Sequence, residues 1–344
     1  MIDPHGTDAL AGRVADARDA FAARWLAIAR EADDPGSSVR ESGSVPDGGA
    51  EAAVRAALGD ERAARAVGTP VPARVDTADI SDLVVVPGVL GDTVGALVAP
   101  LASASDPLAP HGIRTTVARV NGRTGCAANA AALRPIVLEA AAREGRPVNL
   151  VGYSKGCADA LHMLADFPDT HASVHSLTSL AGVVHGTPMA ARTPRWLEAC
   201  LRRVPLPGTP VGDGRALHDL EPGARAAHLA AHPPPAGIRY ASVAGATTEA
   251  NVSRVLRRSW DALGELDPAN DSQVIDRDAV LPAGELLAVV DADHWALALP
   301  IVERLPIARP LVNRNDFPRV TLLRAVLEHV TSPAPATDRN RPPA

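Results

Sequence analysis

Apolar positions recur along this chain with two different periods, and the change of period divides the chain. In residues 8–31, Phe21, Trp25 and Ile28 lie close to helical spacing, with acids and arginines on the other face, which predicts an amphipathic helix. Residues 33–49 are rich in Asp, Pro, Gly and Ser without any period, which is typical of a flexible linker. A second, alanine-rich helix follows this linker.

From about residue 78 to 331, short β-branched runs alternate with helix patterns. The runs are DLVVVPG, IRTTVARVNG, PVNLVG, HSLTSLAGVV, IRYASVAG and ELLAVV. Such alternation predicts an α/β fold, with a mostly parallel central sheet flanked by helices. Residues 189–237 lack strand signals and are predicted to be a helical cap insertion. Residues 1–77 are then an N-terminal helical extension, and residues 332–344 a disordered tail.

Composition narrows the class of protein. With 344 residues, 46% apolar and 22% charged, the chain is long enough for one large domain with additions. A net charge of -6 provides no basic surface for a nucleic-acid partner. Pro87 interrupts the most apolar stretch, residues 83–101, so we expect no transmembrane segment. Three cysteines without CxxC spacing, and a start at Met1 without a secretory signal pattern, favour a cytoplasmic location.

The segment GYSKG, Gly152 to Gly156, carries the first candidate chemistry. A predicted strand, residues 148–151, leads into it and a predicted helix leads out. A serine on such a strand-turn-helix connection is held in a strained conformation that small neighbours tolerate, which explains the two glycines. We therefore expect Ser154 to be a nucleophile exposed at the carboxyl edge of the sheet.

A serine nucleophile needs a base and a group that orients the base. His294, in VVDADHWALALP, follows the last predicted strand and is the candidate base. The segment LDPANDSQVIDRDAVLP provides acids between the preceding strand and this histidine. Asp271 is the first choice because Asn270-Asp271-Ser272 is a tight-turn sequence, and Asp276 is the alternative.

The oxyanion-hole donors and the pocket residues are predicted from their positions relative to Ser154 and the predicted strands. The backbone N–H of Lys155, after the nucleophile, and that of Val89, in VVVPGVLGD, are the expected oxyanion-hole donors, with Leu90 as the alternative to Val89. We expect a substrate pocket that includes Tyr153, His185 and Trp295. PGVLGDTVG matches no phosphate-loop pattern, and the pair of histidines in DTHASVH lacks partners at zinc-ligand spacing, so neither a cofactor nor a metal is expected.

With nucleophile, acid and histidine in this order, residues 82–330 resemble the α/β-hydrolase superfamily. GYSKG, GVVHGTPMA, ANDSQV and ADHWALALP are most similar to bacterial lipases and esterases. The resemblance implies a serine hydrolase that cleaves a small-molecule ester or lipid-like substrate through an acyl-enzyme. The chain departs from the family where its oxyanion loop begins with Pro-Gly and not His-Gly, and where Lys155 follows the nucleophile.

Several alternatives remain open on the sequence. The same residue set would serve an amide, thioester or polyester hydrolase, or an acyltransferase, and a non-catalytic relative would use the pocket for binding. The apolar face of residues 196–204 fits either a helix docked on the core or a lid over an acyl chain. Residues 1–77 fit either a cover over the site or a structural brace.

Overall fold

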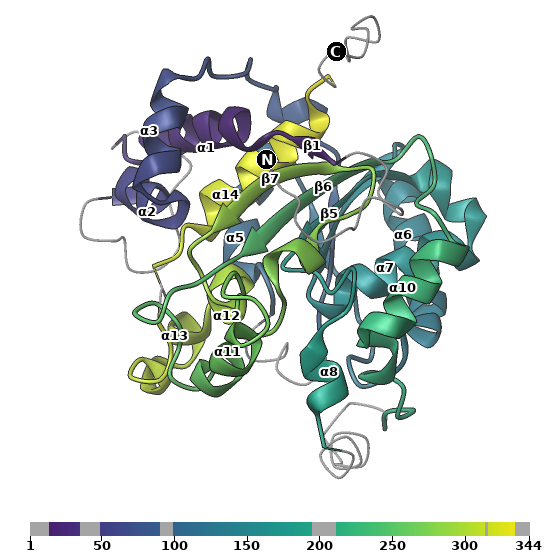
Figure 1. The fold of residues 1–344 in the computed structure, drawn as a ribbon. Helices are drawn as coiled ribbons and strands as arrows, with labels where there is room; N and C mark the ends of the chain where they lie inside the picture. Colours follow the sequence, from purple (N-terminus) through teal and green to yellow (C-terminus); the bar gives the residue numbers. More distant parts are fainter. Residues whose placement is uncertain (1–13, 35–48, 90–98, 195–210, 314–315, 334–344) are drawn as a thin grey trace, which may run out of the picture.

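Seven parallel strands form the centre of the molecule in a computed structural model (Figure 1). The structure describes residues 14–34, 49–89, 99–194, 211–313 and 316–333. The strands are β1 (Ala15–Asp16), β2 (Leu83–Val86), β3 (Thr115–Val117), β4 (Val148–Tyr153), β5 (Val174–Leu180), β6 (Arg239–Gly245) and β7 (Glu285–Val290). Their order in the sheet is β1-β7-β6-β5-β4-β2-β3. The predicted α/β class is confirmed, and all six predicted strands are present.

Helices cover both faces of the sheet because its strands are apolar on both sides. The α-helices are α1 (Arg18–Ala32), α2 (Gly49–Leu58), α3 (Asp60–Gly68), α5 (Ala102–Ser105), α6 (Cys126–Glu144), α7 (Lys155–Asp166), α8 (Pro188–Arg192), α10 (Pro222–Ala231), α11 (Arg257–Gly264), α12 (His294–Ala298), α13 (Ile301–Arg304) and α14 (Arg319–Thr331). Short 3-10 turns lie at 77–79, 106–111, 168–173, 218–220, 276–279 and 306–308.

The side chains of strand β2 alternate between the two hydrophobic cores, one on each face of the sheet. Leu83 and Val85 belong to the core that includes α1, α5 and α14, while Val84 and Val86 belong to the core formed with α6 and α7. Side chains of a strand point alternately to opposite faces, so one four-residue strand contributes to both layers.

The N-terminal segment is part of this architecture. Strand β1 pairs with β7 at the edge of the sheet, and α1 packs against α14, where the Trp25 indole N–H donates to the Thr321 hydroxyl at 3.0 Å (Figure 1). The buried side chains of Arg24 and Glu328 form an ion pair at 3.0 Å across the same interface. The second predicted helix is two helices, α2 and α3, with Gly59 between them at a φ of 76°.

The predicted cap insertion is described only in part. Residues 195–210, which include the expected apolar helix, lie outside the described residues. Helix α10 lies beside α7, where the His228 ring stacks on the His162 ring with centroids 3.7 Å apart (Figure 1). The predicted linker at 33–49 and the tail at 332–344 also lie largely outside the described residues.

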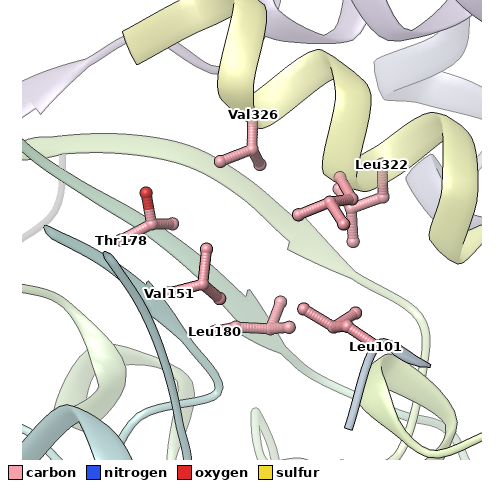
Figure 2. A pocket seen from close by; sticks show the side chains of 7 residues that line it. Leu101, Val151, Thr178, Leu180, Leu322 and Val326 are labelled. Atoms are coloured by element: carbon pink, nitrogen blue, oxygen red, sulfur yellow. The ribbon is translucent and has the colours of Figure 1, made fainter. Parts of the chain in front are cut away.

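A small apolar pocket lies between α14 and the middle of the sheet (Figure 2). Its lining residues are Leu101, Val151, Thr178, Leu180, Leu322, Leu323 and Val326. Leu180 connects this pocket with the carboxyl edge of the sheet, because its carbonyl accepts the backbone N–H of Ser154 at 3.3 Å.

Candidate active site

Ser154 lies on the sharp turn between β4 and α7. Its backbone has a φ of 55° and a ψ of -128°, a conformation that residues with a Cβ rarely adopt. The flanking glycines leave no room for a side chain. A Cβ on Gly156 would lie 2.1 Å from the Val86 carbonyl oxygen, and one on Gly152 would lie 2.5 Å from the Cα of Cys157. The strained turn is therefore held by close packing on both sides, as expected where backbone strain serves a function.

His294 joins Ser154 to Asp271. Its Nε2 lies 2.9 Å from the Ser154 Oγ, and its Nδ1 lies 2.7 Å from Asp271 Oδ2. Both the imidazole and the carboxylate are buried. A carboxylate at Nδ1 favours the tautomer with the proton on Nδ1, which leaves Nε2 free to accept the serine proton. The three side chains form one hydrogen-bonded chain from residues that are far apart in the sequence.

The tight turn at 270–274 fixes the position of the Asp271 carboxylate. Asp271 Oδ1 accepts the backbone N–H groups of Gln273 at 2.9 Å and Val274 at 2.7 Å, while Oδ2 faces the histidine. The alternative acid, Asp276, begins a 3-10 turn, and its carboxylate accepts the N–H of Arg277. Burial raises the pKa of the Asp276 carboxyl above its usual value. Of these two acids, the structure brings Asp271 to the histidine.

The end of β2 lies against the serine. A Cβ on Gly88 would lie 2.7 Å from the Ser154 Cβ and 3.1 Å from its Oγ, so a glycine is required for this approach. The backbone N–H groups of Val89 and Lys155 donate to no acceptor among the described residues. Two uncommitted N–H donors thus belong to the segments that border Ser154.

Comparison with solved structures identifies the fold family. Neither a family model nor a curated protein matches the sequence. The crystal structure of a metagenomic carboxyl esterase is similar, with 31% identity, a TM-score of 0.79, and coverage of 96% of this chain and 95% of that chain. The chain belongs to the α/β-hydrolase superfamily. The mature form of Bacillus licheniformis lipase BlEst2 shares the fold at 20% identity, with a TM-score of 0.52 over 72% of this chain and 96% of that chain.

The three expected pocket residues of this α/β-hydrolase have different surroundings. The Tyr153 side chain is buried, and its ring lies against His294 with centroids 5.1 Å apart. His185 is half-buried, with its Nε2 3.0 Å from the Val280 carbonyl oxygen. Trp295 is also half-buried, on the first turn of α12. The structure thus packs Tyr153 against the histidine, while the other two retain exposed surface.

Asp293 is a residue of the hydrolase site that the sequence reasoning missed. Its carboxylate accepts the N–H groups of Trp295 at 3.0 Å, Ala296 at 2.9 Å and Ser253 at 2.7 Å. It is the N-cap of α12, whose first residue is His294. Asp before a short helical run is a recognisable capping signal, which could have identified this role. Asp293 ties the histidine segment to the loop after β6.

The side chain of Lys155 also has an unexpected role. It is fully buried, and its Nζ lies 2.5 Å from Asp159 Oδ1, one helical turn along α7. The amide of Asn129 donates to the other oxygen of Asp159 at 2.9 Å. The spacing of four residues could have predicted this ion pair. The pair anchors the first turn of the helix that follows Ser154.

Metal ligands and membrane-spanning helices were the two remaining questions from the sequence. Within the described ranges, no three His, Cys, Asp or Glu side chains converge as metal ligands would. The zinc alternative involved His171 and His175, which instead contact the carbonyl oxygens of Leu164 and Val330. No helix in the described part of the hydrolase is both long and apolar enough to cross a membrane.

Proposed function

We propose that this hydrolase cleaves carboxylic esters through an acyl-enzyme on Ser154. The observation that carries the proposal is the hydrogen-bonded chain from the Ser154 hydroxyl through His294 to Asp271. The kinship with a carboxyl esterase over nearly the whole chain supports the choice of ester substrates. The strained turn at Ser154 supports its role as the nucleophile.

Acylation begins when the Ser154 Oγ attacks the ester carbonyl carbon. His294 Nε2 accepts the serine proton, and the carbonyl oxygen becomes an oxyanion that receives the N–H groups of Lys155 and Val89. The tetrahedral intermediate then breaks its bond to the alcohol oxygen. His294 returns the proton to that oxygen, and the alcohol leaves. Asp271 remains ionised and stabilises the imidazolium in both steps.

Deacylation repeats these steps with water. His294 removes a proton from water as its oxygen attacks the acyl carbon, and the same two N–H groups bind the second oxyanion. The bond to Ser154 Oγ breaks, the proton passes to Oγ, and the carboxylic acid is released. An alcohol that replaces water in this step would make the protein an acyltransferase.

The substrate is proposed to be a small-molecule ester or a lipid-like ester, bound beside His185 and Trp295. Both side chains are half-buried, and the backbone of the loop before His185 is held close to the nucleophile, because the N–H of Val183 donates to the Ser154 carbonyl at 3.0 Å.

We also propose a cytoplasmic location, since Cys126 and Cys157 are both free and buried thiols.

The test is intact-mass measurement after exposure to a fluorophosphonate, which reacts with an activated serine. One adduct on the wild type, none on Ser154→Ala and much slower labelling of His294→Ala are expected. His218→Ala, which removes an exposed histidine, is the control and should label at the wild-type rate. A folded wild type that takes no label overturns the proposal and favours a binding role.

An ester panel then defines the reaction. p-Nitrophenyl esters of increasing acyl length give kcat/KM for each chain, and product analysis with added alcohol separates hydrolysis from acyl transfer. Free acid as the sole product supports a hydrolase. An alkyl ester formed in preference to acid identifies a transferase.

A further inference from the structure

Tyr153, the residue before Ser154, contacts the histidine in two ways. Its hydroxyl donates to the backbone carbonyl oxygen of His294 at 2.8 Å, and its ring lies 5.1 Å from the imidazole, with 31° between the two planes. The side chain is 5% exposed, so it offers little surface to a substrate. These contacts join the end of β4 to the first residue of α12.

The backbone of His294 is therefore held from both sides. Its N–H donates to the Asp271 carbonyl at 2.8 Å, and its own carbonyl accepts from the Tyr153 hydroxyl at the same distance. With both peptide groups fixed, the imidazole needs only its side-chain torsions to reach Ser154. A shift of the histidine backbone would move Nε2 away from the serine, and small misplacements of reacting groups are costly.

The ring of Tyr153 adds an electrostatic contribution. When His294 accepts the serine proton, it becomes a cation within 6 Å of an aromatic ring, an arrangement that favours the charged form. Burial raises the pKa of the Tyr153 phenol well above its usual range, with the nearby Asp271 and Asp293 carboxylates acting in the same direction. The hydroxyl thus remains a donor throughout the working pH range.

We infer that Tyr153 is a positioning residue for the base: its hydroxyl fixes the His294 backbone, and its ring supports the imidazole. This inference rests on the proposed function, in which His294 transfers the protons. The same contacts leave Tyr153, one of the expected pocket residues, with little exposed surface.

The test uses the fact that the chain has two tyrosines. Tyr240 is equally buried, and its hydroxyl donates to the Pro235 carbonyl at 3.0 Å. Tyr153→Phe and Tyr240→Phe therefore remove the same kind of hydrogen bond. We expect kcat of Tyr153→Phe to fall about two- to tenfold with KM nearly unchanged, and kcat of Tyr240→Phe to stay at the wild-type value. Both should lose a few degrees of Tm.

A second variant separates the ring from the hydroxyl. Tyr153→Leu removes the ring as well, so kcat should fall further than in Tyr153→Phe, again with KM nearly unchanged. If Tyr153→Leu does not fold, the paired comparison of the two Phe variants still decides the question.

The results that would overturn the role of Tyr153 differ from those that would overturn the proposed function. Equal kcat for wild type and Tyr153→Phe, or an equal loss in Tyr240→Phe, overturns the positioning role while leaving the proposed function intact. A folded Tyr153→Leu with the same kcat as Tyr153→Phe overturns the electrostatic part. A wild type that neither hydrolyses esters nor takes the fluorophosphonate overturns the proposed function and this inference with it.

Discussion

Asp271 holds His294 twice. Its carboxylate Oδ2 lies 2.7 Å from the ring Nδ1, and its backbone carbonyl accepts the His294 N–H at 2.8 Å. One residue therefore fixes both the ring and the main chain of the proposed base. Because Asp271 is itself held by the N–H groups of Gln273 and Val274, the arrangement is in place before a substrate binds.

The carboxylate of Asp271 should be far more important for activity than its neighbours. Asp271→Asn keeps the size of the side chain but replaces the acceptor at Nδ1, which favours the wrong tautomer, and kcat should fall about 10⁴-fold. Asp276→Asn is the matched control and should stay within about twofold. Ester hydrolysis by the two purified variants makes the comparison. A large loss in Asp276→Asn with Asp271→Asn near the wild-type rate would instead identify Asp276 as the orienting acid.

Gly88 should be intolerant of any side chain. A Cβ there would lie 2.7 Å from the Ser154 Cβ, so Gly88→Ala must displace Ser154 or the segment after β2. We expect fluorophosphonate labelling to slow about 100-fold, as for an ångström-scale misplacement. Gly223→Ala, in α10 with open space around it, should label at the wild-type rate and gain up to about 1 kcal/mol of stability. Unchanged labelling in Gly88→Ala would contradict the close approach.

Much of the site could be predicted because it depends on local patterns. Ser154 follows a strand and precedes a helix, and in a parallel sheet the carboxyl ends of all strands meet at one edge. Loops after β6 and β7 must therefore lie near the loop after β4, which brings Asp271 and His294 to the serine. Chain order and strand pattern were sufficient for this step.

The missed features depend on contacts without a local pattern. Tyr153 and His294 are 141 residues apart, and no spacing rule links a phenol to a distant backbone carbonyl. Strand β1 has two residues, too short for a period of two to be recognised. Its pairing with β7 and the packing of α1 on α14 are contacts between segments far apart in the sequence, which no local pattern indicates.

The ion pair between Lys155 and Asp159 is a buried pair of charges at the start of α7, directly after Ser154. Lys155→Met leaves the Asp159 carboxylate buried without its cation, which should lower the free energy of unfolding by about 3–5 kcal/mol. The double variant Lys155→Met/Asp159→Leu removes both charges and should recover most of this loss. Urea unfolding at neutral pH measures both. A single variant as stable as the wild type would show that the pair contributes nothing.

The stacked pair of His162 and His228 should make stability depend on pH. Burial lowers the pKa of His162 to about 3 and that of His228 to about 4, and the nearby Arg225 cation acts in the same direction on both. The neighbouring charged groups are His232 and Lys155, which also disfavour protonation, and Asp219, which opposes it at His228.

The sign of this effect follows from proton uptake. Below about pH 6.5 these histidines bind protons in the unfolded state but remain neutral in the folded state. The free energy of unfolding therefore falls as the pH drops towards 4. His162→Gln should therefore show a smaller drop in Tm between pH 7.5 and pH 5 than the wild type. His218→Gln, at an exposed histidine, should keep the wild-type drop. Equal drops in all three proteins would remove the stacked pair as the cause.

The N-terminal segment should act as a brace and not as a cover. Helix α1 buries Trp25 against α14, and α2 reaches the histidine loop, where the Ala57 carbonyl accepts the Asp291 N–H at 2.8 Å. Deleting residues 1–77 would expose the apolar face of α14, so we expect insoluble or unfolded protein by circular dichroism.

Trp25→Ala separates the two roles without a deletion. The cavity it leaves should cost about 3–5 kcal/mol of stability, measured by urea unfolding, while the fluorophosphonate labelling rate of the folded molecules stays at the wild-type value. An autoinhibitory cover predicts the opposite, because loosening it would expose Ser154. Faster labelling of Trp25→Ala, or a folded deletion variant with raised kcat, would therefore identify the segment as a cover.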